Sequence, residues 1–456
     1  MFIKRVVLEN LRGFRHLDFV FERPAPHSNS DGPARAYAGW AVVTGDNAAG
    51  KTAFLKAIAL ALVGTDTARA LQPSLQGWIR REASEAVIAV EIVAGEEDKF
   101  AQGRRYEHPF WSELKLVADA GPEVTLSVGD KYKAKGKGPK HGPWAENPTG
   151  WFSVGYGPFR RLYGASPDAQ RMMVGPSRVA RFATMFREDA TLGECEIWLK
   201  DLHVKKLEMR ERESRILDQV LRLLNDDFLR NGLRIEKVDS EGLWLCDASN
   251  IVLPLADMSE GYRAALALLV DLVRHMVDVF GPENLVQEQQ GRVVVPHSGV
   301  VLIDEIDSHL HPEWQRQIGF WFKERFPNIQ FIVTTHSAMI CQAADENMIY
   351  HLPPPGSVCE PNRIIDADYW NIVKSKPDVI YLSPAFGMQF TRSPRAVQAR
   401  KQFSELKAKK HAGILSDAEE EVMQGLLPFT DEDQGENHAS GRSDLTSPSD
   451  LDVSRA

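Results

Sequence analysis

The stretch that decides the fold runs from Trp40 to Thr52 and reads WAVVTGDNAAGKT. Its first five residues are the apolar, β-branched run of a buried strand, and the apolar residues from Thr52 to Val63 predict a helix. Between the two, Gly45 to Thr52 fits the pattern G-x-x-x-x-G-K-[ST], whose backbone N–H groups surround phosphate oxygens at the start of a helix. Strand, glycine-rich loop and helix in this order predict a phosphate-binding loop rather than a chance turn.

The side chains of this loop indicate which phosphate compound it binds. A lysine at position 51 reaches the β and γ phosphates of a nucleoside triphosphate, and the Thr52 hydroxyl is a ligand for Mg²⁺. The sequence therefore predicts ATP and Mg²⁺ as cofactors. The predicted cofactor-binding residues of the loop are Gly45, Asp46, Asn47, Ala48, Ala49, Gly50, Lys51, Thr52 and Ala53.

A pair of acids follows a second apolar run, Val300 to Ile303. Ligands of parallel sheets gather at the carboxyl ends of the strands, so Asp304 and Glu305 are expected beside the phosphate-binding loop. We predict that Asp304 joins Thr52 in holding Mg²⁺ and that Glu305 is the general base for the attacking water. The alternative is an acidic pair that only caps the next helix.

A third apolar run, Phe331 to Thr335, ends in His336. On its own such a histidine is more often structural, but on the strand after Asp304 we expect it to donate a hydrogen bond to the γ-phosphate. Between these two runs, the Asp and His side chains of residues 307–311 (DSHLH) allow a different interpretation, a zinc site.

The segment Asp257–Arg263 (DMSEGYR) precedes a long apolar helix expected over residues 264–279. Ser259 can cap that helix, and Glu260 suits its first turn. Gly261 is a poor helix former, yet Ser-x-Gly at a helix start offers a hydroxyl and accessible N–H groups to a phosphate. Because this chain's own nucleotide is already held elsewhere, we predict that Ser259, Glu260 and Gly261 contact the nucleotide of a second subunit. An ordinary cap with a packing glycine is the alternative.

The composition describes an ordinary folded protein of 456 residues with a net charge of −9. Four scattered cysteines indicate reduced thiols, no signal peptide is visible, and no apolar run is long enough to cross a membrane. We therefore expect a cytoplasmic protein with no membrane contact. The net charge neither supports nor excludes a nucleic-acid partner.

Strands and helices alternate around buried strands, which predicts an α/β core. A strand pair is expected over residues 2–22, further strands over 84–128, and loops over 129–149 and 282–298. The predicted segments are an ATPase N-lobe (1–167), an inserted helical subdomain (168–240), an ATPase C-lobe (241–359), a mostly helical extension (360–430) and a disordered acidic tail (431–456).

The order of the motifs resembles the ABC-type ATPases of the SMC and RecF kind. Residues 304–312 most resemble the OLD-like ATPases and those of the Septu or PARIS kind, which serve in bacterial anti-phage defence. The resemblance implies an α/β ABC-type P-loop ATPase head with a mixed sheet, an inserted helical subdomain and a C-terminal helical extension. It also implies a homodimer or higher homo-oligomer formed around ATP, with residues 307–311 as the dimer-facing loop and His336 as the switch.

Some features depart from that resemblance. The family has a glutamine that touches Mg²⁺ and the attacking water, but the matching place, residues 151–160, has none. The helical segment 168–232 is too short for a coiled-coil arm, and Asp366 and Asp368 are only a weak candidate for a nuclease site. We therefore predict a separate effector protein, a nuclease, and residues 360–428, which are amphipathic and helical after residue 395, are expected to help dock it. The alternative is that these residues cover the edge of the ATPase's own sheet.

A second hypothesis is a RecF-like repair ATPase that clamps DNA by itself. A basic loop with Lys131, Lys133, Lys135, Lys137 and Lys140 is compatible with DNA contact, although most such loops are simply solvated. A transporter subunit is disfavoured by the insertions.

Overall fold

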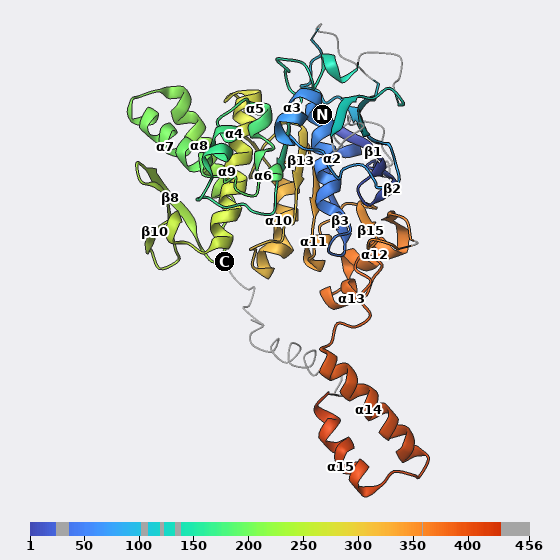
Figure 1. Ribbon diagram of the computed structural model, residues 1–456. Helices are drawn as coiled ribbons and strands as arrows, with labels where there is room; N and C mark the ends of the chain where they lie inside the picture. The colour runs from blue at the N-terminus through green and yellow to red at the C-terminus, as the bar shows by residue number, and fades with distance from the viewer. Residues whose placement is uncertain (24–35, 102–107, 119–122, 133–137, 358, 430–456) are drawn as a thin grey trace, which may run out of the picture. The chain divides into compact units, whose positions relative to one another are not determined.

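The computed structural model describes residues 1–23, 36–101, 108–118, 123–132, 138–357 and 359–429. The chain divides into two compact units, Met1–Gly387 and Met388–Ala456. Figure 1 shows the elements of both.

A six-stranded sheet forms the centre of the first unit, in the order β16-β15-β3-β14-β13-β7. Its strands are β3 (Gly39–Gly45), β7 (Ser153–Tyr156), β13 (Gly299–Ile303), β14 (Ile329–Thr334), β15 (Ile349–Leu352) and β16 (Asn362–Ile364). All neighbours are parallel except β16, which is antiparallel to β15. Every residue of β13 and β14 is buried, which explains why these strands appear in the sequence as continuous apolar runs.

Each face of this sheet packs against a different layer. Ala41 and Val43 of β3 belong to one hydrophobic cluster, and Trp40 and Val42 belong to another. The alternation follows from the two-residue period of a strand.

The first layer contains helix α2 and a five-stranded antiparallel sheet, in the order β2-β1-β4-β5-β6. Its elements are β1 (Phe2–Leu11), β2 (Phe14–Val20), α2 (Lys51–Val63), α3 (Thr65–Leu71), β4 (Glu85–Val93), β5 (Phe110–Ala118) and β6 (Val124–Val128). The buried Gln330 side chain joins the two sheets, because its amide accepts from the Ile3 N–H (2.7 Å) and donates to the Ile3 carbonyl (2.8 Å).

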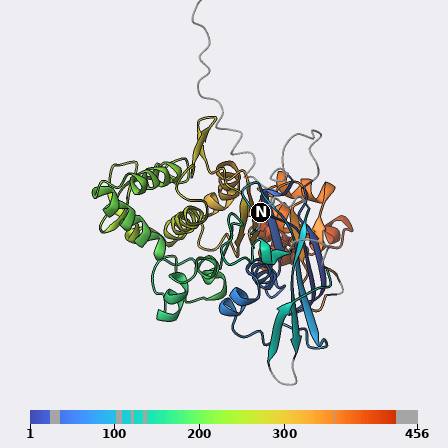
Figure 2. The same ribbon diagram turned by 90° about the horizontal axis from the view of Figure 1, so that it is seen from above.

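The second layer is mainly helical and lies on the opposite side of the central sheet, as Figure 2 shows for the green helices and the blue strands. Its helices are α7 (Glu194–Leu207), α8 (Glu211–Leu224), α9 (Glu260–Phe280), α10 (Pro312–Arg325), α11 (Ala338–Cys341), α12 (Asp366–Lys374) and α13 (Pro377–Tyr381). The short helices α5 (Ser177–Ala180) and α6 (Ala183–Phe186) instead contribute Val179 and Met185 to the cluster of the first layer, and α4 (Pro167–Met173) packs with α6 in a small cluster of its own. Small sheets pair β8 (Arg234–Asp239) with β9 (Gly242–Cys246) and β10 (Val252–Pro254), and β11 (Gln287–Gln289) with β12 (Arg292–Val294). Two 3₁₀ turns are η1 (Pro139–His141) and η2 (Leu255–Asp257).

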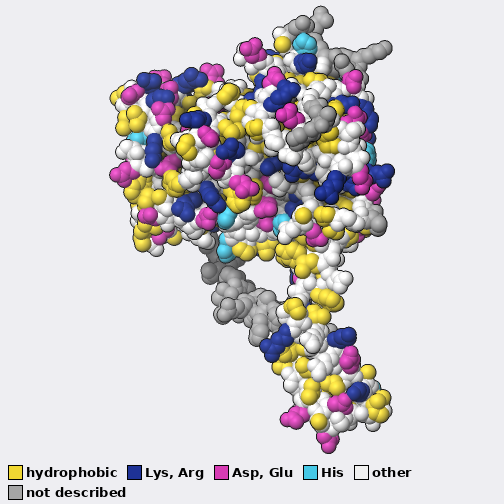
Figure 3. Space-filling view, in the orientation of Figure 1, with side chains coloured by type: hydrophobic (Ala, Val, Ile, Leu, Met, Phe, Trp, Pro, Cys, Tyr) yellow, Lys and Arg dark blue, Asp and Glu magenta, His cyan; other side chains and the backbone are white. Residues whose placement is uncertain are grey.

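The second unit is a helical hairpin of α14 (Pro394–His411) and α15 (Asp417–Leu426), followed by the 3₁₀ turn η3 (Leu427–Phe429). Ser416 and Glu419 form a capping box at the start of α15. None of the α15 residues is buried, and Figure 3 shows hydrophobic side chains on the hairpin surface.

The predicted α/β class with mixed strand directions is confirmed, as are the strand pair within residues 2–22 and the helix after the phosphate-binding loop. The prediction for residues 282–298 was wrong in part, because they contain the β11–β12 hairpin. Most residues of this hairpin are exposed, so it lacks the apolar alternation that identifies a half-buried strand.

The boundary between the two compact units lies after Gly387 and does not coincide with residue 360, where the predicted extension begins. β16, α12 and α13 lie after residue 360, yet Ile364, Ile372 and Ile380 belong to the core of the first unit. The other predicted boundaries stay predictions, and the tail 431–456 lies outside the described residues.

All four cysteines are free thiols, as expected. No helix among the described residues has the length and apolarity needed to cross a membrane.

Candidate active site

The phosphate-binding loop connects the carboxyl end of β3 with the first turn of α2. Gly50 precedes the helix with φ 98°, a conformation that L side chains rarely adopt. A Cβ atom at this position would lie 2.7 Å from Cζ of Phe14, so both the backbone and the packing require glycine. The sequence pattern of the loop therefore corresponds to a tight backbone turn at a helix N-terminus, the arrangement that binds phosphate.

Lys51 is buried inside this turn. Its ammonium donates hydrogen bonds to the carbonyl oxygens of Gly45 (2.8 Å) and Asp46 (3.0 Å). Burial lowers the pKa of Lys51, and the negative charges of Glu305 and Asp304 oppose that shift. The positive charge of Lys51 therefore interacts with the negative charges of Asp304 and Glu305 within one site.

The two predicted metal ligands are in direct contact. The Thr52 hydroxyl donates to Oδ2 of Asp304 (2.6 Å), and the Thr334 hydroxyl donates to Oδ1 (2.5 Å). Asp304 is only 1% exposed. A hydroxyl oxygen beside a carboxylate is the hard-oxygen donor set that Mg²⁺ prefers, so the residues present fit this ion.

Glu305 follows directly and lines the same pocket as Lys51. Its backbone has φ 44°, in the left-handed region. Its N–H donates to the Thr334 hydroxyl (2.7 Å), and Oε2 accepts from the Ser308 hydroxyl (3.1 Å). A carboxylate that lines the pocket next to Asp304, on a backbone in an unusual conformation, is compatible with a general base.

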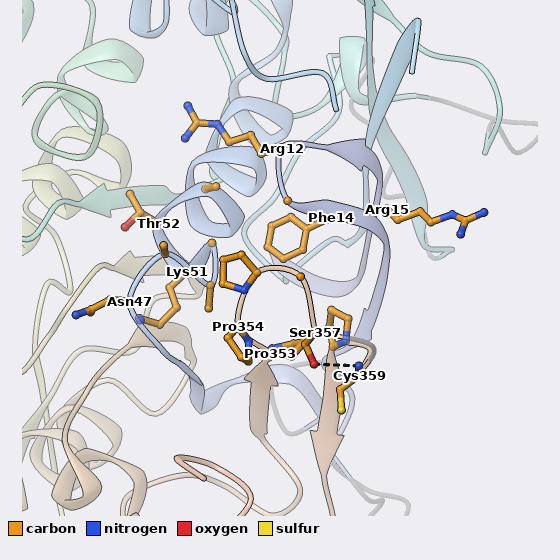
Figure 4. Close-up of a pocket in the computed structure, with 18 of the residues that line it drawn as sticks. Arg12, Phe14, Arg15, Asn47, Lys51, Thr52, Pro353, Pro354, Ser357 and Cys359 are labelled. Atoms are coloured by element: carbon orange, nitrogen blue, oxygen red, sulfur yellow. Dashed lines mark hydrogen bonds between the residues drawn. The ribbon is translucent and has the colours of Figure 1, made fainter. Parts of the chain in front are cut away.

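The pocket has a volume of about 650 Å³, within the range of about 300–1,000 Å³ that is common for small-molecule sites. One wall is the phosphate-binding loop, and the others are the β1–β2 turn around Phe14 and the segment after β15 that begins at Pro353. Figure 4 shows the Phe14 ring close to Lys51, with the proline-rich segment facing both. Sequence reasoning missed Arg12, Arg15 and the proline-rich wall, because no pattern connects a hairpin turn with a loop more than 300 residues away.

His336 also lines this pocket. Its backbone N–H donates to Oδ1 of Asp307 (3.3 Å), which also accepts from the Thr335 hydroxyl (2.5 Å). The predicted switch histidine and the predicted dimer-facing loop are therefore joined through one carboxylate.

Ser259 and Gly261 lie elsewhere. They line a different pocket of about 450 Å³, together with His309 and His311. Ser259 is the N-cap residue of α9 but makes no capping hydrogen bond with its side chain. A Cβ atom at Gly261 would lie 2.5 Å from the carbonyl oxygen of His309, so this glycine has a packing role within its own chain. This close contact supports the alternative interpretation, in which Gly261 is a packing glycine.

The zinc interpretation has no support. Among the described residues, no group of three or more His, Cys, Asp or Glu side chains is arranged to hold a metal ion. His311 instead caps α10, because its Nδ1 accepts from the N–H of Glu313 (3.3 Å). His309 Nδ1 lies 3.7 Å from the Glu260 carboxylate.

Only part of the predicted basic loop can be assessed. Lys133, Lys135 and Lys137 lie outside the described residues, and Lys131 pairs with Glu9, at 2.6 Å from Oε1. On the face drawn in Figure 3, basic side chains are interspersed with acidic ones. DNA contact through this loop stays a prediction.

Two family models match segments that together contain these motifs. Residues 5–102 match an AAA domain, and residues 213–341 match the family described as AAA domain, putative AbiEii toxin, Type IV TA system. The chain is thus related to the AAA-type ATPases. The phosphate-binding loop lies in the first matched segment, and Ser259, Asp304 and Glu305 lie in the second.

Individual proteins agree with these matches. The chain is 41% identical over 108 residues to a retron Ec83 probable ATPase from Escherichia coli, a match that covers 24% of this chain and 18% of that protein. It is 28% identical over 186 residues to the Septu protein PtuA from Bacillus thuringiensis, covering 38% of this chain and 43% of that protein. Each match thus spans less than half of the relative. The SMC head bound to the C-terminal winged-helix domain of ScpA aligns with a TM-score of 0.44 and 16% identity, over 81% of this chain and 99% of that one.

Proposed function

We propose that the protein binds and hydrolyses ATP with Mg²⁺, dimerises around the nucleotide and controls a separate effector in anti-phage defence. The observation that supports hydrolysis best is that Lys51, Thr52 and Glu305 line one pocket while Asp304 accepts a hydrogen bond from Thr52. These residues supply a cation for the phosphates, ligands for Mg²⁺ and a base for water, which are the parts that phosphoryl transfer needs.

In this proposal, Lys51 and the loop N–H groups bind the phosphates, and Thr52 and Asp304 hold Mg²⁺. When bound by these two residues, Mg²⁺ would neutralise charge that develops on the phosphates. Glu305 accepts a proton from the attacking water, and His336 donates a hydrogen bond to the γ-phosphate.

A second subunit completes the site. Ser259 lines a different pocket from Lys51, so its hydroxyl is not part of the nucleotide pocket of its own chain. The hydroxyl makes no capping bond, and the start of the 21-residue helix α9 carries positive dipole character. Both features favour contact between Ser259 and the γ-phosphate held by a partner copy.

The defence role rests on the relatives. The curated proteins that match include retron probable ATPases and Septu proteins. We propose that the effector is a nuclease and that the α14–α15 hairpin, with its exposed apolar side chains, helps to dock it.

Replacing Glu305 by Gln tests the hydrolytic function. This change keeps the size of the side chain but removes the base, so we expect ATP affinity to be retained while kcat falls by about 10²–10⁴-fold. Phosphate release with Mg²⁺, together with binding of a fluorescent ATP analogue, would separate the two quantities.

Lys51→Ala is the matched variant, and it is expected to lose nucleotide binding as well as hydrolysis. Hydrolysis by Glu305→Gln at the wild-type rate would show that another group serves as the base.

A further inference from the structure

Arg160 is a buried cation that the proposed chemistry does not yet use. It follows β7, at the place where the family resemblance leads one to expect a glutamine, and it is 4% exposed. Its guanidinium donates to five backbone carbonyl oxygens, those of Gly157 (3.1 Å), Asp304 (2.9 Å), Glu305 (3.0 Å), Ile306 (3.3 Å) and Ser308 (3.2 Å). Four of the five belong to the segment that carries the predicted base.

The environment of this guanidinium is unusual. Burial lowers the pKa of Arg160 to about 10, and Asp307, Asp304 and Glu305 oppose the shift through space. In the described part of the chain, its hydrogen bonds go to backbone carbonyls, with no carboxylate among the acceptors. The two Nη atoms carry four N–H groups in a planar fork and together contact all five carbonyls, whereas a lysine ammonium has only three N–H groups on a single nitrogen.

Two residues hold the Glu305 backbone from opposite sides. Thr334 accepts the Glu305 N–H through its hydroxyl and the Ile306 N–H through its carbonyl (3.0 Å). Arg160 binds the carbonyls of the same two residues. Because the N–H and the carbonyl of Glu305 are both hydrogen-bonded, its backbone is held at φ 44°. This conformation sets the direction of its side chain at the nucleotide pocket.

Strand β7, which precedes Arg160, is itself anchored. Tyr156, at the end of β7, accepts the Asp304 N–H through its carbonyl (2.9 Å). Its phenol donates to Oδ2 of Asp271 (3.1 Å), a buried residue in the middle of α9. Arg160 also lines a small pocket with Glu260 and Arg263 from the start of the same helix.

We infer that Arg160 is a positioning residue that fixes the backbone of residues 304–308, so that the Glu305 carboxylate faces the attacking water. Arg160 also links the orientation of this carboxylate to the segment beside the start of α9. The inference rests on the proposed hydrolysis by Glu305. Arg160 is not among the residues that line the nucleotide pocket, so it acts through Glu305 rather than on ATP.

Replacing Arg160 by Lys tests this role, because lysine keeps the charge but cannot span five carbonyls. We expect kcat to fall by about 10²-fold, the cost that a displacement of about 1 Å can have, while the Kd for ATP stays within about threefold. Because Arg160 acts through Glu305, the Arg160→Lys/Glu305→Gln double variant should hydrolyse ATP no more slowly than Glu305→Gln alone.

Arg181→Lys is the matched control. Arg181 is also buried, and burial lowers its pKa to about 10 as well, but its side chain bonds the Ser177 carbonyl and not the 304–308 segment. Its kcat should stay within about twofold of wild type. A second variant, Arg160→Ala, should regain hydrolysis when guanidinium ions are added, and Arg181→Ala should show no such gain.

Each outcome decides a separate question. Wild-type protein that hydrolyses no ATP would overturn the proposed function, and this inference with it. With an active wild type, Arg160→Lys turnover within about threefold of normal would overturn the inference alone. So would unfolding of both Arg160 variants while Arg181→Lys stays folded, because Arg160 would then be a purely structural residue.

Discussion

At the scale of single residues, the candidate site depends on side chains that the fold brings into direct contact, as Thr52 and Asp304 show. Asp304 and Glu305 directly follow an apolar run, and Lys51 and Thr52 lie in the G-x-x-x-x-G-K-[ST] pattern, so these four positions could be predicted from the sequence. Arg160 could not be predicted, because its carbonyl partners in the acidic segment lie 144 to 148 residues away. A backbone carbonyl carries no sequence signal.

Gly50 illustrates a residue whose role is set by both pattern and space. Gly50→Ala would place a Cβ atom 2.7 Å from the Phe14 ring at φ 98°. We expect the loop to shift and the Kd for ATP to rise at least about tenfold, equal to about 1.4 kcal/mol. Equilibrium binding of a fluorescent nucleotide measures this change.

Gly164→Ala is the control for that measurement. Gly164 has φ 94° but no atom within 4 Å of the added Cβ, so it shares the backbone strain without the clash. Its nucleotide affinity should equal that of the wild type. Equal losses of affinity in both variants would contradict a local role for Gly50.

At the scale of elements, long periodic segments were predicted well and short polar ones were not. The apolar helix expected over residues 264–279 is α9, and it begins at Glu260, directly after the predicted N-cap residue Ser259. The β11–β12 hairpin was missed because each strand has only three residues and all of β11 is exposed. An element can be recognised in a sequence when its burial requires a regular pattern of apolar residues.

The placement of α9 leads to a test of the dimer. If Ser259 serves the partner's nucleotide, Lys51→Ala and Ser259→Arg proteins are each inactive alone, but a heterodimer contains one site with both residues intact. Mixing the two should restore part of the ATP hydrolysis, measured as phosphate release, provided that one site can work alone.

Mixing Lys51→Ala with Glu305→Gln provides the control. Both of these changes affect the loop-bearing side of a site, so no heterodimer of the two has an intact site and no hydrolysis should return. Recovery in this mixture would mean that subunits restore one another by another route. Absence of recovery in the first mixture would count against Ser259 acting in the partner.

At the scale of the whole molecule, the two compact units indicate where the chain can be cut. Ending the protein after Gly387 removes the α14–α15 hairpin and leaves β16 in the central sheet. We expect nucleotide affinity and the thermal unfolding midpoint of the first unit to be kept, while capture of a co-expressed effector nuclease is lost. Co-purification from cells that express both genes measures this capture.

A chain that ends after Phe429 is the matched control, since it keeps the whole described hairpin. It should bind the effector as the full chain does. A protein cut after Gly387 that still captures the nuclease would place the docking surface on the first unit. The exposure of the apolar side chains Ile414 and Val422 on the hairpin would then need another explanation.

The strand order of the central sheet also has a consequence for how the protein is made. β3, the first of its six strands to leave the ribosome, lies between β14 and β15, which follow only at residues 329–352. The antiparallel sheet of β1, β2, β4, β5 and β6 pairs segments closer in the chain and can form during synthesis. The loop that binds phosphate is thus translated early but gains its supporting strands late. A nascent chain that stalls before Leu352 exposes the unpaired apolar edges of β3 and becomes a substrate for chaperones.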